Sequence, residues 1–529
     1  MSQSMTLLVL LAPAALVVAG VAPSAWANRA PRKMAALCLV AGAFAFTVAL
    51  SAALAVSGLG SLSSGTFGVD GVGLGVCLDA LSVIMFLLVA FIGVVVLRYS
   101  RNYLDGDQRQ GFFFKWLALT LAAVLTLVVA GNLALLILAW IATSVCLHRL
   151  LLFYGERPAA QLAAKKKFIA SRIGDLCLFV AAWLLWSRFG TLDLPILLQA
   201  ARTAPDPAPI LSAPALLIVL AALLKSAQAP VHGWLLEVME TPTPVSALLH
   251  AGVINAGGFL ILRLADIVAP STAALSTLAL VGGATALFGS IVMLTQTSVK
   301  ISLAYSTIAQ MGFMMLECGL GAFPAALLHI VAHSLYKAHA FLSSGSVIDL
   351  ARASWTPSPG GQPHPARFTL ALAATIAVAL IIGPFFGASL VAKPGALTLA
   401  AVLLLGLTHL IANALDERPS LYVVGRTVAL GAAFAASFFA LHAGAEALVA
   451  GSLPLSRPLH GPMDLALIAL VIVSFAGVTL FQSVMARHAT SPFWRAAYVH
   501  LSQGLYLNTL ANRLVLRAWP RHPTSAVTL

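Results

Sequence analysis

Charged side chains are scarce in this sequence: Asp, Glu, Lys and Arg make up 9% of its 529 residues, against about 25% in ordinary soluble domains. Hydrophobic residues account for 60% of the chain, and the mean hydropathy is +0.97. Apolar runs recur that are long enough to cross a bilayer. These features exclude an ordinary soluble protein and predict an all-α polytopic membrane protein.

Cysteine and metal-binding motifs are also sparse. The five cysteines are scattered and form no CxxC pair, so neither a disulfide framework nor a thiolate metal site is predicted. The chain has no redox-cofactor motif and no nucleotide-binding loop. We therefore expect no cofactor, no metal and no enzymatic activity of this chain alone. The net charge of +13 does not indicate nucleic-acid binding, because the basic residues follow a membrane topology.

That topology rests on about 15 apolar runs that could each span a membrane. With boundaries good to about 4 residues, they cover 5–22, 34–57, 79–97, 113–131, 133–153, 168–188, 210–228, 243–266, 272–295, 300–319, 323–348, 367–391, 396–415, 426–450 and 463–486. Most basic loop residues follow odd-numbered runs, among them Arg29, Arg98, Arg109, Arg157, Lys165–Lys167, Arg352 and Arg487. Because basic loops stay inside, this pattern places the N-terminus outside and the C-terminus in the cytoplasm.

The stretch Leu223–Asp266 departs most from a simple apolar helix. It carries Lys225, meets Pro230, crosses the polar segment Glu240–Pro244 and re-enters an apolar run that contains His250. A lysine at the bilayer centre costs about 2.5–3.5 kcal/mol, and a broken helix beside such a group is typical of transporter ion sites. The alternative is a lysine that reaches the interface beside a harmless kink.

A second interruption is predicted at Gly383–Gly387, around Pro384 in the twelfth run. The break at Pro230 lies five runs earlier, and this spacing suggests two five-helix repeats of opposite orientation. We expect N-terminal spans at 1–112, a first repeat at 113–266, a second at 267–415, further spans at 416–489 and a cytoplasmic tail at 490–529. The Pro- and Gly-rich segment Ser354–Pro365 is predicted to be a linker.

The eleventh run repeats titratable residues every four positions. His329, His333 and Lys337 share one helical face, and Lys300 opens the run before it. A His-x3-His pair could hold zinc, but no third ligand lies nearby and Lys337 would repel the ion. The spacing favours a proton relay, because histidine titrates near neutrality. Two hydrogen-bonded core histidines remain the alternative.

Two acids are candidates for the same pathway or for charge pairing. Asp175 lies inside the sixth run, three residues after Arg172, so structural pairing and pathway membership are both open. Glu240 lies in the interfacial break, close enough in sequence to Lys225 to be its counter-charge.

The tail from Ser491 to Arg517 alternates aromatic and leucine residues with polar ones. Trp494 and Tyr498 lie four residues apart on one face, which predicts an amphipathic helix. Such a helix either lies on the cytoplasmic membrane surface or docks a partner.

Three long segments carry a family resemblance: KSAQAPVHGWLLEVMETPTPVSALLHAG, QTSVKISLAYSTIAQMGF and HIVAHSLYKAHAFLSSGS. Over about residues 75–415 the chain resembles the antiporter-like subunits of complex I, such as subunit L, and of multisubunit cation/proton antiporters. The resemblance implies a core of two inverted five-helix repeats. It also places six residues on a central hydrophilic axis: Lys225, His250, Lys300, His329, His333 and Lys337.

One departure from the complex I pattern concerns the fifth run. Complex I subunits of this type carry a glutamate after its tryptophan, paired with the seventh-run lysine, whereas here Ile141 follows Trp140. No acid lies between Gly131 and Tyr154. The sequence leaves open which group replaces this partner of Lys225.

The segments AWIATSVCLHRLLLFYGERPAA, KKKFIASRIGDL and HAGVINAGGFLILR resemble the DabB family. DabB is the membrane subunit of an inorganic carbon pump in the bacterial inner membrane, and its zinc-binding partner DabA resembles a β-carbonic anhydrase. The resemblance implies an ion-conducting subunit, with protons the expected ion, that drives carbon dioxide or bicarbonate uptake through a cytoplasmic DabA-like subunit. The alternatives are a proton-translocating subunit of complex I or of a cation/proton antiporter, and a non-conducting membrane scaffold.

Overall fold

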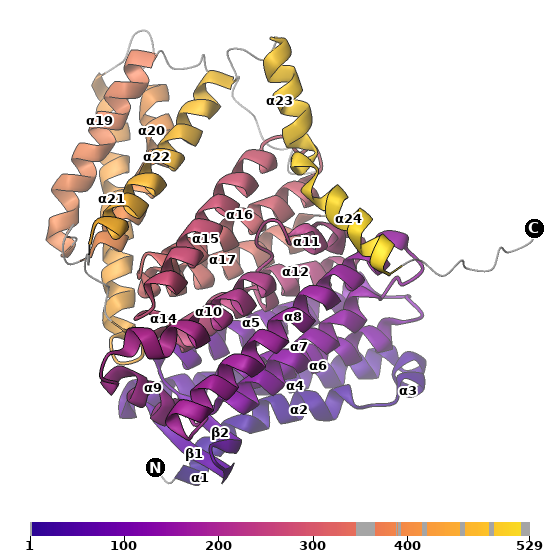
Figure 1. Ribbon diagram of the computed structural model, residues 1–529. Coiled ribbons are helices and arrows are strands. Elements are labelled where there is room, and N and C mark those ends of the chain that lie inside the picture. The colour runs from indigo at the N-terminus through magenta and orange to yellow at the C-terminus, as the bar shows by residue number, and fades with distance from the viewer. Residues whose placement is uncertain are drawn as a thin grey trace, which may run out of the picture.

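The computed structural model describes residues 3–344, 365–387, 389, 393–414, 421–454, 461–485 and 491–519. Long helices lie side by side in one tilted stack, with a smaller group from the last third of the chain at its edge (Figure 1). Among the described residues, 11 helices are long and apolar enough to cross a membrane. Each predicted apolar run overlaps a helix in the described part of the chain. The prediction of a polytopic helical membrane protein is confirmed.

The helices up to the first break include long ones that run along the stack and short ones beside or between them. In chain order they are α1 (Gln3–Thr6), η1 (Leu7–Leu10), α2 (Leu11–Gly20), α3 (Ser24–Arg29), α4 (Pro31–Leu59), α5 (Ala80–Tyr103), α6 (Gln110–Val129), α7 (Leu133–Leu151), α8 (Pro158–Phe189), α9 (Leu194–Thr203) and α10 (Pro207–Lys225).

Shorter helices follow the break and lead into three long ones. They are α11 (Gly233–Glu237), η2 (Val238–Glu240), α12 (Thr243–Ala251), η3 (Val253–Asn255), α13 (Ala256–Arg263), α14 (Ala265–Val268), α15 (Thr272–Met293), α16 (Val299–Gly319) and α17 (Phe323–Leu342). The group at the edge and the tail comprise α19 (Pro365–Ile382), η5 (Gly383–Phe386), α20 (Pro394–Ala414), α21 (Leu421–Val449), α22 (Pro462–Met485), α23 (Pro492–Ser502), η7 (Gly504–Tyr506) and α24 (Leu507–Ala518).

Both predicted helix breaks are confirmed. The helix α10 ends at Lys225, and α11 begins only at Gly233. The helix α19 ends at Ile382 and continues as the 3-10 turn η5 around Pro384. Most of the predicted linker Ser354–Pro365 lies outside the described residues, as do Arg352 and Arg487.

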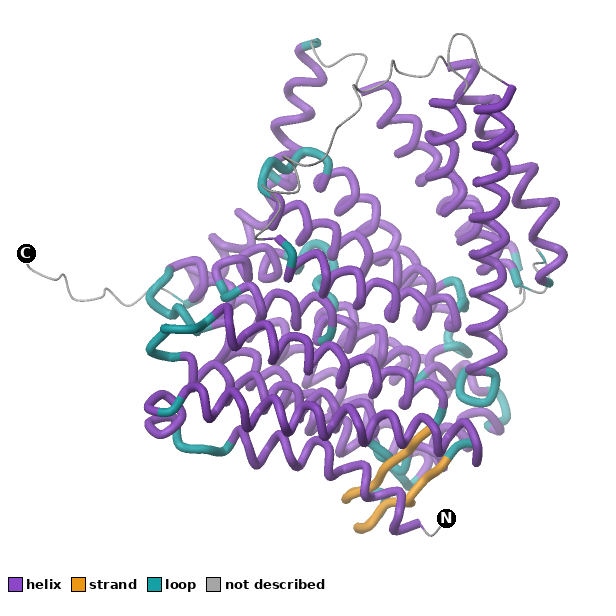
Figure 2. Tube along the Cα trace, turned by 180° about the vertical axis from the view of Figure 1, so that it is seen from behind, coloured by secondary structure: helices purple, strands orange, loops and turns teal. Residues whose placement is uncertain are grey.

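A β-hairpin marks one end of the stack and was not predicted. Strands β1 (Leu62–Val69) and β2 (Val72–Leu78) pair antiparallel across Asp70 and Gly71, both of which have positive φ. An Asp-Gly pair in this conformation is typical of a two-residue hairpin turn, so the sequence did hold a signal for it. Figure 2 shows both strands beside the N-terminus. We call this the hairpin end.

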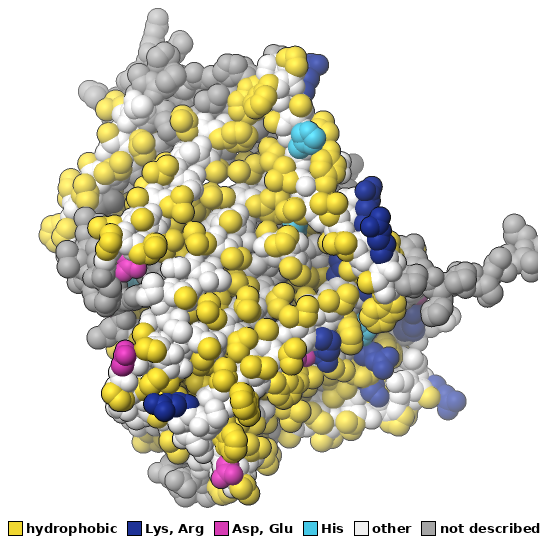
Figure 3. Space-filling view, in the orientation of Figure 1, with side chains coloured by type: hydrophobic (Ala, Val, Ile, Leu, Met, Phe, Trp, Pro, Cys, Tyr) yellow, Lys and Arg dark blue, Asp and Glu magenta, His cyan; other side chains and the backbone are white. Residues whose placement is uncertain are grey.

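The opposite end holds Arg109, Arg157 and the tail helix α24, and we call it the basic end. Arg109 pairs with Glu156 at 3.5 Å, and Lys165 donates to the carbonyl oxygen of Trp519 at the end of α24. Most Lys and Arg side chains in view gather along the side of α23 and α24 (Figure 3). Among the described residues, the basic side chains Arg109, Arg157 and Lys165, which follow odd-numbered runs, therefore share one end, as predicted.

Helices α15 and α16 pack closely through glycine. A Cβ atom at Gly282 would lie 2.6 Å from the Gly312 carbonyl oxygen, whereas one at the neighbouring Gly283 would lie 3.8 Å from Leu316 Cδ1. Small residues let helix backbones approach in this way, a common device in membrane helix packing. This contact fixes α16, and with it Lys300, against the stack.

The tail packs on its own chain. Tyr498 donates from its hydroxyl to the Thr295 carbonyl oxygen at 3.4 Å, and Trp494 lies against Phe481 with ring centroids 5.2 Å apart. The two aromatic residues on the predicted face thus both contact this chain, and Tyr498 remains 46% exposed. The amphipathic helix itself is confirmed, with a kink at η7 between its two halves.

Candidate functional site

Lys225 closes α10 deep in the molecule, 8% exposed. Its Nζ donates to Ser144 Oγ on α7 at 2.9 Å and lies 4.3 Å from the centre of the Trp140 ring. A hydroxyl and an aromatic face both stabilise a desolvated ammonium group. The alternative of a lysine that reaches the interface is therefore wrong.

Helix α8 supplies the charges around Lys225. Lys167 Nζ donates to the Ser144 carbonyl oxygen at 2.6 Å, and Arg172 pairs with Asp175 at 2.6 Å. Asp175 attracts both Lys167 and Lys225 electrostatically. The acid that is missing from α7 thus has its counterpart on α8, and the predicted Arg172–Asp175 pair is confirmed.

Ser144 and Lys167 were missed as members of this site. Lys167 was counted only as part of a basic loop cluster, although it lies inside α8 and is 4% exposed. It precedes Asp175 by eight residues, a spacing that places both on one helical face. This spacing was the available signal. Ser144 had no such signal in the sequence, because a lone serine in an apolar helix is common.

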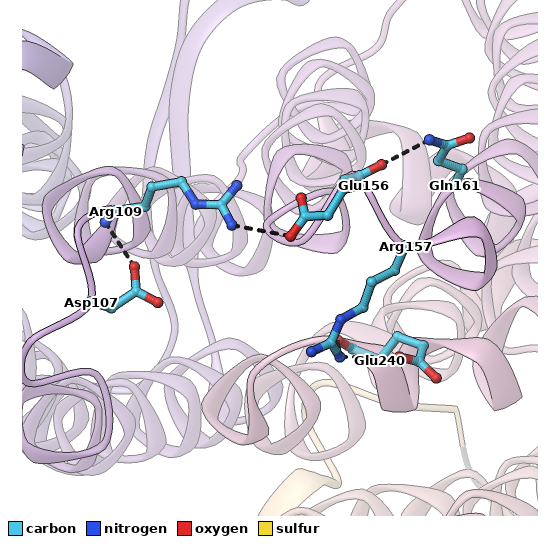
Figure 4. A network of polar contacts seen from close by, with 7 residues as sticks. Asp107, Arg109, Glu156, Arg157, Gln161 and Glu240 are labelled. Atoms are coloured by element: carbon cyan, nitrogen blue, oxygen red, sulfur yellow. Dashed lines mark hydrogen bonds and ion pairs between the residues drawn. The ribbon is translucent and has the colours of Figure 1, made fainter. Parts of the chain in front are cut away.

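The pairing of Glu240 with Lys225 is wrong. Glu240 lies at the basic end, where its carboxylate is 3.1 Å from Arg157 Nη1 and its side chain is 42% exposed. Figure 4 shows this pair beside Arg109 and Glu156. The helix break carries Glu240 toward the surface, and Lys225 stays buried at the end of α10.

Lys300 also lies toward the basic end, at the start of α16. Its Nζ donates to Thr243 Oγ1 at 3.3 Å, and the Thr243 hydroxyl donates to the Tyr103 hydroxyl oxygen at 3.2 Å. Lys300 is therefore brought to α12, at the end of that helix away from His250.

His250 lies fully buried near the end of α12. Its Nδ1 is 3.0 Å from Thr307 Oγ1, and its ring stacks on Phe341 with centroids 4.3 Å apart. Its Nε2 has no hydrogen-bond partner among the described residues. The Thr307 hydroxyl group thus holds one of the two ring nitrogens.

The row on α17 is confirmed. His329 and His333 have ring centroids 6.0 Å apart, and Lys337, which is fully buried, donates to the Leu303 carbonyl oxygen at 3.1 Å. His333 interacts with His329, His250 and Lys337. Among the described residues, no group of three or more His, Cys, Asp or Glu side chains is placed to hold a metal.

Glu317 on α16 extends this row and was missed by sequence reasoning. His329 Nδ1 lies 2.9 Å from Glu317 Oε2, and both side chains are at most 10% exposed. An acid inside a membrane helix is costly without a partner, and this cost was the available signal. Its pairing with a helix that follows a tight turn could not be read from spacing alone.

Buried polar groups connect Lys225 to the α17 row. Ser226, next to Lys225, donates from its hydroxyl to the Ile254 carbonyl oxygen at 3.1 Å, and Asn255 Nδ2 donates to Ser334 Oγ at 2.7 Å. All three side chains that donate or accept here are fully buried. Buried polar side chains thus lie between the Lys225 cluster and α17, at the kink between α12 and α13. The alternative of a harmless kink beside Lys225 is therefore wrong.

This fold and polar line define a multi-pass membrane protein of the antiporter-like class. Residues 130–357 match the family model described as NADH:quinone oxidoreductase/Mrp antiporter, TM. Residues 66–114 match the N-terminus of complex I chain 5. The structure of an Mrp complex from Dietzia sp. superposes with a TM-score of 0.65 at 24% identity, covering 96% of this chain and 59% of that one. This likeness is one of fold.

Curated relatives define the family more closely. The probable inorganic carbon transporter subunit DabB2 of Halothiobacillus neapolitanus is 41% identical over 88% of this chain and 83% of its own length. The probable subunit DabB of Hydrogenovibrio crunogenus is 37% identical over 83% of this chain and 82% of its own. The chain belongs to the DabB family.

Proposed function

We propose that this chain is the proton-conducting membrane subunit of an inorganic carbon uptake complex. The observation that supports it most is the buried line of titratable groups from Lys225 to Lys337 and His329. Each such group costs free energy inside a membrane protein, so a chain that keeps several in two neighbouring buried clusters has a use for them. This argues against a passive scaffold.

The buried polar groups suggest the route that a proton takes through the chain. They do not say whether protons move inward or outward. Lys225, Lys167 and Asp175 form one cluster, and His250, His333, Lys337 and His329 form the other. Ser226, Asn255 and Ser334 lie between the two. A proton that leaves the ammonium group of Lys225 would have buried acceptors on both sides of the kink between α12 and α13.

The role in carbon uptake follows from the names of the relatives. In this proposal the membrane is the inner membrane of a bacterium, the N-terminus is periplasmic and the basic end is cytoplasmic. A DabA-like zinc-binding subunit would dock at the basic end and carry out the carbon chemistry. Proton movement through this chain would supply the energy.

The test uses a bacterial strain that lacks carbonic anhydrase and expresses this chain with its partner. Growth in air without added carbon dioxide or bicarbonate is measured. His333→Gln keeps size and hydrogen bonding but cannot titrate, so growth in air and uptake of labelled bicarbonate should fall while membrane levels hold. The matched control is His339→Gln, six residues on and exposed. Equal uptake by the two variants would leave His333 as an ordinary core histidine.

A further inference from the structure

A cavity of about 250 Å³ opens between α7 and α8, beside the Lys225 cluster. Its wall is formed by Ser144, Val145, His148, Arg149, Lys167, Phe168, Ser171 and Arg172. Val145 and Phe168 are 47% and 39% exposed, so the opening faces the outside of the helix stack among apolar side chains. The inner wall is polar and reaches the Ser144 backbone that Lys167 contacts.

The wall of this cavity carries more positive charge than the chain balances. Arg149, Lys167 and Arg172 line it, and Lys225 lies behind Ser144. Three acids belong to α8 and to the described helices packed against α7 and α8, and each already pairs with a cation. These pairs are Asp175 with Arg172, Glu237 with Lys166 and Glu240 with Arg157.

Hydrogen-bond donors on the wall are unused. The Lys167 ammonium group has three donors, and the structure gives it one acceptor, the Ser144 carbonyl oxygen. Arg172 Nε is a buried donor with no partner among the described residues. His148 Nδ1 is also buried without a partner there, and it donates in one of the two ring tautomers. Lys167 itself is 4% exposed. Donors of this kind, converging from two helices, match an acceptor with several oxygens.

We propose that this cavity binds an oxyanion group, supplied either by the phosphate of an anionic phospholipid or by free bicarbonate. Basic pockets between membrane helices bind lipid head groups in this way, and the apolar rim suits acyl chains. The bound charge offsets Lys167 and, through Ser144, lies next to the proton-carrying Lys225. The site would then couple anion occupancy to the charge on that lysine, which goes beyond proton conduction itself.

Binding is measured on the full-length chain by two independent probes. Native mass spectrometry after purification with phosphatidylglycerol or phosphatidylcholine detects a retained lipid, and labelled bicarbonate is titrated into nanodiscs of phosphatidylcholine only. Lys167→Gln should weaken binding at least about tenfold, and Arg149→Gln severalfold, because each removes a charge-assisted hydrogen bond. Lys165→Gln is the matched control, since Lys165 lies on the same helix but contacts Trp519 outside the cavity.

Retention of phosphatidylglycerol by the wild-type and Lys165→Gln chains identifies the lipid phosphate as the ligand. Saturable bicarbonate binding in phosphatidylcholine identifies a free oxyanion. If neither probe binds, or if both cavity variants bind like the wild type, the proposal is wrong. Arg149 is exposed, so Arg149→Gln decides the matter if Lys167→Gln fails to fold. Both readouts are independent of proton flux, so they can fail while the proposed function stands.

Discussion

Lys225 shows how a buried charge can be kept without an acid on α7, where the complex I pattern has one. A buried ion that loses its partner is strongly destabilised. Here Ser144 accepts a hydrogen bond from the ammonium group, the Trp140 ring lies beneath it, and Asp175 attracts it from α8. These three side chains together take the place of the glutamate that pairs with this lysine in the complex I pattern.

Asp175→Asn tests this division at the residue scale. The substitution keeps the shape of the side chain but removes its charge, and each loss of about 1.4 kcal/mol of attraction lowers the ratio of charged to neutral Lys225 about tenfold. We expect labelled bicarbonate uptake to fall without loss of protein from the membrane. Ser144→Asp, which places a carboxylate beside Lys225, should restore part of the uptake in the Asp175→Asn background. Uptake unchanged in Asp175→Asn would exclude Asp175 as the counter-charge.

Spacing within one helix made part of the site predictable. The period of 3.6 residues is enough to place His329, His333 and Lys337 on one face. It does not say which neighbouring helix faces that row, so the contact of His329 with Glu317 could not be foreseen. Lys167 was missed for a related reason. It follows Lys165 and Lys166 in the sequence, and the membrane topology already explained a basic cluster at that position.

At the scale of elements, the breaks in the helices were predictable and their consequences were not. Proline placed the interruptions near Pro230 and Pro384 correctly. The direction in which Glu240 leaves the break depends on how α11 and η2 pack, so its pairing with Arg157 had no sequence signal. The β-hairpin did have one, in Asp70–Gly71.

The α15–α16 contact predicts opposite outcomes for two adjacent glycines. Gly282→Ala should lower the stability of the solubilised protein by about 1–3 kcal/mol, because the new methyl group meets the Gly312 backbone, which cannot yield. Gly283→Ala should be neutral or slightly stabilising, since its methyl group makes ordinary contact with Leu316. Thermal unfolding in detergent compares the two. Equal midpoints would show that the helices do not pack as described.

The tail helix α24 is attached through two asparagines. Asn508 and Asn512 each accept from Lys166 at 2.7 Å and donate to Glu237 on α11. Replacing both by Ala leaves the buried Lys166–Glu237 pair without those partners, at a cost of about 1–3 kcal/mol.

We expect trypsin to cut the tail at Arg495, Arg513 or Arg517 faster in the double alanine variant than in the wild type. Thr509→Ala, exposed on the same helix, is the control. A cleavage rate equal to that of the control would mean that the tail is held elsewhere.

For the whole molecule, the composition and the succession of apolar runs were sufficient to predict a polytopic helical membrane protein and the order of its helices along the chain. For the loops that the structure describes around Arg109, Arg157 and Lys165, the distribution of basic residues predicted correctly that they share one end. The polar face of the tail contacts α8 and α11. In the proposed complex, a partner would therefore meet the outer face of α24 and the neighbouring basic loops. Contacts between segments more than 300 residues apart leave no trace in local spacing.

Proton flux measures directly whether Lys225 carries protons through this chain, as we propose. Proteoliposomes containing the chain and its partner are given a membrane potential, and a pH-sensitive dye reports proton entry. Lys225→Ala should reduce the flux to that of empty liposomes, while Lys165→Gln should match the wild type. Wild-type flux through the Lys225→Ala chain would show that protons do not need Lys225 to cross this protein.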